Sequence, residues 1–202
     1  MQQIRLTGIL VLIKIKSEVR QLKLLMHMCC GPCAVYPYQV LSQGHDITGL
    51  FYNPNIHPYT EYKKRMDTAQ EFADKSGYKL IIIDEYNLEE FLRNAAFREG
   101  QRCMMCYADR ISRAASVAKK GKFDAFTTTL LVSPFQKHDL IRSIGEEAGR
   151  KYGVEFLYED FRVGFKEGVL KSKEMQLYRQ PYCGCIYSER DRYAPRRKDE
   201  RR

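Results

Sequence analysis

The stretch LKLLMHMCCGPC, residues 22–33, joins a short apolar run to a turn that holds three cysteines. A short apolar run that ends at a turn signal is typical of a buried strand, so we predict a strand over residues 22–28. The turn with Cys29, Cys30 and Cys33 follows that strand directly. Parallel sheets carry their sites at the carboxyl ends of strands, and a functional site is therefore expected at this turn.

Further apolar runs follow along the chain, and helical stretches separate them. The predicted later strands are 46–52, 79–84, 124–129 and 155–158. The predicted helices are 34–42, 58–76, 88–97, 107–120, 139–152 and 166–178. Strands that alternate with helices predict a single α/β domain, in which a mostly parallel, Rossmann-like sheet has helices on both faces.

The composition restricts the class of protein. The chain has 202 residues, 34 of them basic and 25 acidic, which gives a formal net charge of +9. An apolar fraction of 44% excludes a disordered chain. The sequence has no run of about 18 apolar residues and no signal-peptide pattern, so we expect a cytoplasmic protein without a membrane segment. We expect an N-terminal extension at 1–22, a catalytic domain at 23–188 and a basic tail at 189–202.

Seven cysteines are the main chemical feature, and each is a candidate metal ligand. They form three clusters: Cys29, Cys30 and Cys33; Cys103 and Cys106; Cys183 and Cys185. Reduced thiols in such clusters indicate metal binding or redox chemistry. Thiolate-only sets favour zinc or iron–sulfur clusters, and a number above the four ligands of a zinc site favours iron–sulfur.

The spacing within two of the clusters suggests different roles. Adjacent side chains at Cys29 and Cys30 are expected to point apart, which would suit two irons of a cluster or two different metals. Cys183 and Cys185, with only Gly184 between them, either share a metal site or close a strained disulfide. Because a strained disulfide is easily reduced, this pair is also a redox candidate.

Six separated motifs identify a known family. They are MHMCCGPC (26–33), FYNPNI (51–56), CMMCY (103–107) followed by Arg110, TTTLLVSPFQK (127–137), EDFR (159–162) and CGCIYSER (183–190). In this order they resemble the QueH-type epoxyqueuosine reductases, from about residue 24 to residue 193. The resemblance implies a fold related to the nucleotide-binding PP-loop enzymes. It also implies the last step of queuosine formation, in which the epoxide oxygen of epoxyqueuosine is removed at the wobble position of a tRNA anticodon.

The resemblance further implies a [4Fe–4S] cluster and no cobalamin. The cluster ligands that it implies are Cys29, Cys30, Cys103 and Cys106, and Cys183 with Cys185 is then a redox-active pair. A competing arrangement gives the cluster only three cysteines. A second, mononuclear iron would then take its ligands from Cys33, Cys183, Cys185 or a carboxylate.

The reaction needs two electrons and two protons, and the oxygen leaves as water. The electron donor is not identifiable from the sequence. Candidates for the proton donor are Asp160, Tyr107 and Asp191, although Asp160 is equally suited to a structural ion pair with Arg162. The four histidines are expected to be surface or packing residues, with His27 near the mouth of the site.

The basic residues fit a tRNA partner, because phosphates attract positive charge. The candidate phosphate contacts are Lys63, Lys64, Arg65, Arg110, Arg196 and Arg197. Arg110 lies one helical turn after Cys106 and could instead screen a negative cluster. A merely solvated helix face is an equal explanation for the first three.

Three other functions compete with this hypothesis. An iron–sulfur tRNA thiolation enzyme of the PP-loop type needs a glycine-rich ATP loop, and residues 29–33 hold CCGPC in that place. A zinc-bearing RNA-binding module would be colourless. A thioredoxin-like dithiol reductase would work without metal and would rely on one dominant Cys-x-x-Cys, whereas this chain has two such spacings.

Overall fold

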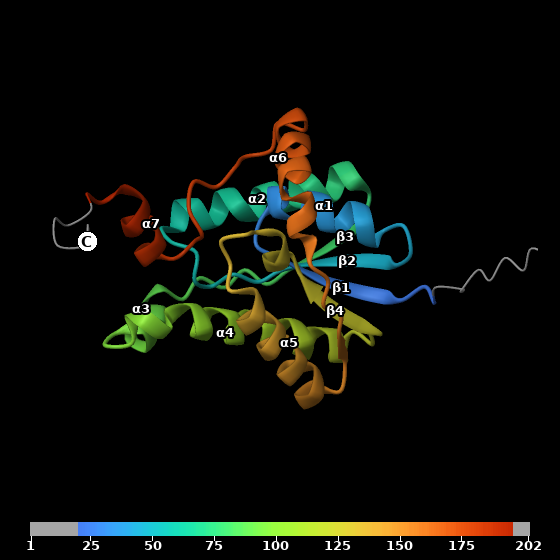
Figure 1. Ribbon diagram of the computed structural model, residues 1–202, viewed down its shortest axis with the longest axis horizontal. Coiled ribbons are helices and arrows are strands. Elements are labelled where there is room, and N and C mark those ends of the chain that lie inside the picture. The colour runs from blue at the N-terminus through green and yellow to red at the C-terminus, as the bar shows by residue number, and fades with distance from the viewer. Residues whose placement is uncertain (1–19, 196–202) are drawn as a thin grey trace, which may run out of the picture.

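The computed structural model describes residues 20–195 as a five-stranded parallel sheet with helices on both faces (Figure 1). The strand order is β3-β2-β1-β4-β5. The strands are β1 (Lys23–Met28), β2 (Asp46–Phe51), β3 (Lys79–Ile82), β4 (Ala125–Thr128) and β5 (Glu155–Phe156). The helices are α1 (Gly31–Leu41), α2 (Tyr59–Ser76), α3 (Leu88–Ala95), α4 (Arg102–Lys120), α5 (His138–Tyr152), α6 (Phe165–Glu174) and α7 (Ile186–Tyr193). The predicted Rossmann-like α/β class is therefore confirmed.

The helices divide between the two faces of the sheet. Helices α1, α2 and α6 cover one face, and α4 and α5 cover the other (Figure 1). Helices α3 and α7 lie at the end toward which the strands run (Figure 1). Short 3₁₀ helices at Glu99–Gln101, Thr129–Val132 and Phe161–Gly164 connect the larger elements. None of the helices within residues 20–195 combines the length and the apolar character needed to cross a bilayer.

Strand β1 is the centre of the sheet. Its residues 24–28 are buried, because β2 pairs with one edge, β4 with the other, and helices cover both faces. The chain moves outward from β1 through β2 to β3, then crosses back to β4 on the other side of β1 and ends at β5 on the opposite edge. The carboxyl ends of β1 and β4 therefore form the point at which the strand order reverses, where α/β folds bind their ligands. Cys29 directly follows β1.

Most elements differ from the prediction by a few residues at one end, and three of the differences bear on the site or on the division of the chain. Helix α1 begins at Gly31, because Pro32 occupies its first turn, where proline is favoured, and Cys33 is helical. Helix α4 begins at Arg102, so Cys103 lies in a helix where we predicted a loop. Helix α7 spans Ile186–Tyr193 and so crosses position 189, at which we predicted the start of a solvated tail. The division of the chain into three parts otherwise stays a prediction, and residues 1–19 and 196–202 lie outside the described residues.

Helix α1 packs so closely on α2 that position 31 accepts only glycine. A Cβ at Gly31 would lie 2.5 Å from the backbone oxygen of Thr68 and 2.8 Å from its Cγ2 atom. We expect Gly31→Ala to lower the free energy of unfolding by about 2 kcal/mol, because overfilling a packed contact forces the backbone to move. Denaturant unfolding measures this change. Gly100→Ala is the control, since nothing lies within 4 Å of its Cβ position, and equal transition midpoints for the two variants would contradict the prediction.

Candidate metal and redox centre

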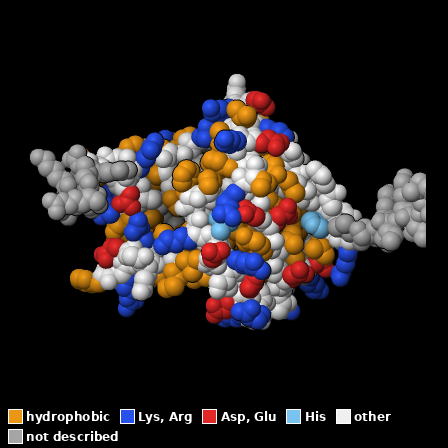
Figure 2. All heavy atoms as spheres, viewed as in Figure 1, with side chains coloured by type: hydrophobic (Ala, Val, Ile, Leu, Met, Phe, Trp, Pro, Cys, Tyr) orange, Lys and Arg blue, Asp and Glu red, His pale blue; other side chains and the backbone are white. Residues whose placement is uncertain are grey.

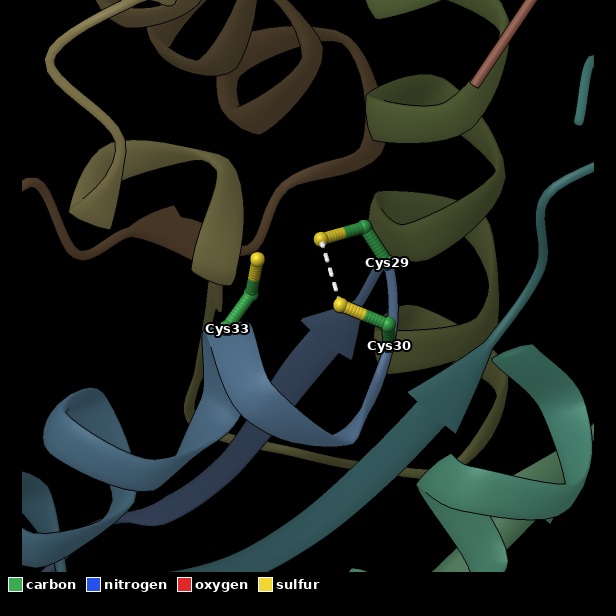
Figure 3. A group of neighbouring side chains, drawn as sticks. All are labelled: Cys29, Cys30 and Cys33. Carbon is green, nitrogen blue, oxygen red and sulfur yellow. Dashed lines mark hydrogen bonds between the residues drawn. The ribbon is translucent and has the colours of Figure 1, made fainter. Parts of the chain in front are cut away.

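Cys29, Cys30 and Cys33 form a compact group, which we call the thiol triad. Their sulfur atoms all lie within 4.8 Å of one another (Figure 3). The Sγ atoms of Cys29 and Cys30 are 3.8 Å apart, so the expectation that these neighbours point apart is wrong. Cys30 is the extended residue that caps α1, and the turn into the helix brings its sulfur back toward that of Cys29. Among the described residues, this is the one group of three or more His, Cys, Asp or Glu ligands with such spacing.

The three thiols of the triad do not ionise alike. Hydrogen bonds from Cys30 and Cys33, together with Arg110 and the hydroxyl of Thr129, hold the pKa of Cys29 well below its usual value. Burial raises the pKa of Cys30, and the hydrogen bond to Cys29 raises that of Cys33. Cys29 is therefore the thiol of the triad that loses its proton most readily. Since metal ligands must be deprotonated, metal binding through these sulfurs releases protons.

A buried arginine supplies positive charge next to the thiols. Arg110 is 2% exposed and donates hydrogen bonds to Asn53 Oδ1 and, at 3.7 Å, to Cys106 Sγ. Its charge also acts on Cys29. A guanidinium enclosed in this way has no access to a tRNA phosphate, so the prediction of a phosphate contact is corrected. The alternative prediction, that Arg110 screens a negative site, agrees with its position.

His27 lies beneath the site and not at its mouth. The side chain is fully buried, with Nδ1 2.8 Å from Thr128 Oγ1 and Nε2 3.1 Å from the carbonyl oxygen of Tyr52. Burial, and then the charge of Arg110, lowers the pKa of His27 to about 3. The imidazole is therefore neutral near pH 7, and it links β1 to β4 and to the residue after β2.

The cysteine pair near the C-terminus is held beside the same end of the sheet. Arg65 is fully buried and donates hydrogen bonds to the backbone oxygens of Tyr182 at 2.9 Å and of Cys183 at 2.7 Å. The backbone amide of His57 donates to Gly184 O at 2.8 Å. Cys185 is 9% exposed, and Cys183 is exposed. Both act electrostatically on Cys106, and Cys29 acts on Cys183, so the three cysteine clusters lie at the same end of the sheet.

Three side-chain amides that the sequence analysis did not select contact the sulfurs. Asn55 donates to Cys106 Sγ at 3.0 Å, Gln180 to Cys33 Sγ at 3.0 Å and Gln136 to Cys183 Sγ at 3.3 Å. Tyr107 donates to the side-chain oxygen of Gln136 at 2.6 Å, which orients that amide. Asn55 and Gln136 belong to the FYNPNI and SPFQK motifs, so their presence in those motifs was the available signal.

Comparison with known proteins then settles the family. A family model described as epoxyqueuosine reductase QueH matches residues 24–191. The chain belongs to the QueH family. An epoxyqueuosine reductase QueH of Dehalococcoides mccartyi is 34% identical over 173 residues, which cover 85% of this chain and 95% of that protein. The QueH of Thermotoga maritima is 36% identical over 174 residues, which cover 81% and 88%.

A solved structure is also similar in part. It is a U34-tRNA thiolase NcsA from Methanococcus maripaludis with its [4Fe–4S] cluster, at 14% identity and a TM-score of 0.48. The alignment covers 84% of this chain and 61% of that one. A likeness this distant has no bearing on the chemistry of the site.

The QueH chain places the candidate proton donors as follows. Asp160 forms an exposed ion pair with Arg162 at 2.5 Å, and the hydrogen bonds from that arginine lower its pKa to about 2. The ion pair that the sequence analysis gave as the alternative role is therefore present, and a role for Asp160 as proton donor stays a prediction. Burial raises the pKa of Tyr107, which keeps its phenol protonated. Asp191 is bound to Arg102 at 2.8 Å on the surface.

The predicted tRNA contacts divide between surface and interior. Lys63 and Lys64 lie on α2. Lys63 is partly exposed and Lys64 is exposed, with its Nζ atom 5.5 Å from the ring centroid of Tyr178. Arg65 is buried against Glu61 at 2.7 Å, so it is corrected from a phosphate contact to an internal support. Arg196 and Arg197 lie outside the described residues. On the face shown in Figure 2, basic side chains are interspersed with acidic ones and form no single patch.

Proposed function

We propose that this QueH chain reduces the epoxide of epoxyqueuosine in a tRNA anticodon to the alkene of queuosine, the last step of queuosine formation. The observation that carries the proposal is the buried thiol triad at the carboxyl end of β1, in a chain that belongs to the epoxyqueuosine reductase family. A soft-donor group at the point where the strand order reverses is suited to metal-dependent redox chemistry.

We propose that Cys29, Cys30 and Cys33 hold a [4Fe–4S] cluster. Support comes from the donor set, which contains thiols alone, from the convergence of the three sulfurs, and from the buried charge of Arg110. When bound, such a cluster supplies electrons one at a time at low potential. The competing arrangement, in which Cys183 and Cys185 hold a second, mononuclear iron, would exclude these two thiols from acting as a redox pair. Cys103 and Cys106 lie outside the triad, and their part in metal binding is a separate proposal.

We further propose that Cys183 and Cys185 act as a dithiol. Oxidation of the two thiols to a disulfide gives two electrons and two protons, while both epoxide C–O bonds break and the oxygen leaves as water. An external electron donor must then reduce the disulfide. Support comes from the contacts of Cys183. Its sulfur accepts a hydrogen bond from the side-chain amide of Gln136, and Tyr107 orients that amide by donating to its oxygen. Tyr107 is proposed as a positioning residue for this pair.

The partner in this proposal is a tRNA that carries epoxyqueuosine. Lys63 and Lys64 are the described candidates for phosphate contacts, and their contribution would weaken with salt. The proposal includes no cobalamin. It places the protein in the cytoplasm, because reduced thiols persist there.

The test is anaerobic purification, analysis of iron, sulfide and zinc, and incubation with epoxyqueuosine-containing tRNA and a strong reductant. We expect iron and sulfide in equal amounts, about four each per chain, and conversion of the nucleoside to queuosine. Turnover should be unchanged by added cobalamin or ATP. Zinc without iron would refute the cluster, and an iron-loaded protein that leaves the epoxide intact would refute the substrate. ATP-dependent turnover would favour a thiolation enzyme.

A further inference from the structure

A small cavity lies beside Cys106 at the carboxyl end of the sheet. It has a volume of about 160 Å³ and is enclosed by the loop after β2, by α3 and by α4. Tyr52, Phe91 and Met105 form its apolar walls. Pockets for drug-sized ligands measure about 300–1,000 Å³, so this one has room for a single ring system and not for a whole nucleotide.

One buried acceptor in the wall of this cavity has no hydrogen-bond donor, although the amides of Asn87 and Asn94 also line it. Asn55 lines the cavity and is 6% exposed. Its amide nitrogen donates to Cys106 Sγ, whereas its Oδ1 atom is buried and has no hydrogen-bond partner. A buried acceptor without a donor is costly, and a ligand that donates to it recovers that cost. The unpartnered oxygen therefore indicates that the cavity receives a ligand with N–H or O–H groups.

Two carboxylates in the wall make the same demand. Asp109 accepts a hydrogen bond from Tyr52 at 3.1 Å on one oxygen and has acceptor capacity left, and Glu90 lines the cavity nearby. Partial desolvation raises the pKa of Asp109, the hydrogen bond from Tyr52 and the charges of Arg110 and Arg113 lower it, and the charge of Glu90 raises it. The lining contains no lysine or arginine. A phosphate would be repelled here, which restricts the ligand to an uncharged or cationic group.

We propose that this cavity, with Asn55, Glu90 and Asp109 as its recognition residues, binds the base of the substrate nucleotide by a guanine-type edge. That edge presents a ring N–H beside an exocyclic NH₂, and one carboxylate can accept from both. This inference rests on the proposed function, because the base of epoxyqueuosine is a deazaguanine with that edge. Enzymes that modify a base in a nucleic acid take it out of the stack into a pocket, and aromatic side chains such as Tyr52 and Phe91 stack on it there.

The position of the cavity agrees with this assignment. Cys106 forms part of its wall and interacts electrostatically with Cys183 and Cys185. A base held here therefore lies next to the proposed redox pair, and a substituent on the base can extend toward the thiols. The amine of the epoxyqueuosine substituent could donate to the same carboxylates. Binding through that amine would not depend on the exocyclic NH₂ of the base, whereas binding through the base edge would. The test uses this difference.

The experiment measures binding of anticodon stem-loop RNA to the iron-loaded protein at fixed salt. One RNA carries guanosine at the wobble position, and the other carries inosine, which lacks the exocyclic NH₂. We expect wild-type protein to prefer guanosine by about 10-fold, the size of one bidentate base contact. Asp109→Asn should abolish this preference. Glu89→Gln, which removes a neighbouring exposed charge outside the cavity, should retain it.

Two results would overturn the assignment: equal binding of both RNAs by wild-type protein, or an unchanged preference in Asp109→Asn. Asp109 is an exposed residue, so its substitution should leave the fold intact. Thermal unfolding of Asp109→Asn checks this. Reduction of epoxyqueuosine tRNA is measured separately. Turnover without base preference would refute the cavity and leave the proposed function, whereas base preference without turnover would refute the function and leave the cavity.

Discussion

Serine in place of Cys29, Cys30 or Cys33 is expected to remove most of the iron from the protein and to lower turnover by at least about 100-fold. Changes to outer partners of a metal site cost about 10–100-fold in affinity or activity, so loss of a direct ligand begins at the top of that range. Serine has nearly the shape of cysteine but offers a hard oxygen donor in place of soft sulfur. The defect is therefore chemical and not one of packing.

Iron, sulfide and visible absorption after anaerobic reconstitution measure this effect. Cys103→Ser is the matched control, because Cys103 lies on α4 outside the triad, and it should retain its iron. Cys183→Ser and Cys185→Ser should also retain iron but lose turnover. If Cys103→Ser loses as much iron as the triad variants, the triad assignment is wrong, and the ligand set that the family resemblance implies is favoured instead. Full iron content in Cys33→Ser would refute the triad.

The order of strands and helices was predictable because its signals are local. Buried strands appear as short apolar runs, and breakers such as Gly77 separate them from the helices. The start of α1 also has a local signal, because Pro32 is favoured in the first turn of a helix. The start of α4 had none, since the residues around Cys103 show neither a capping residue nor an apolar period.

The arrangement of the site was predictable only in part. Spacing along the chain shows that Cys29 and Cys30 are neighbours, but the direction of each sulfur depends on the backbone turn between strand and helix. Charge shows that Arg65 and Arg110 are cations, but their burial depends on tertiary contacts with distant segments. One signal was available for Arg65, because Glu61 precedes it by four residues, the spacing of a helical ion pair.

Replacing Arg65 by methionine is expected to lower the free energy of unfolding by about 3–5 kcal/mol, because it leaves a buried carboxylate without its partner. Arg65 is fully buried and binds Glu61 at 2.7 Å, and Glu61 is itself 7% exposed at its side chain. Denaturant unfolding measures the loss. Arg142→Met removes an exposed pair with Glu146 of the same i,i+4 spacing and should leave the free energy of unfolding almost unchanged. A similar cost for both variants would contradict the buried-charge argument.

A double variant separates the two roles of Arg65. In Arg65→Met with Glu61→Leu, no charge is left unpaired, so most of the lost stability should return, since apolar replacements of buried ion pairs are often neutral. The hydrogen bonds from Arg65 to the carbonyl oxygens of Tyr182 and Cys183 remain absent. We therefore expect Cys185 to react faster with iodoacetamide than in the wild type, and turnover to stay low while iron is retained. Recovery of turnover together with stability would show that the arginine balances a charge and does not position the cysteine pair.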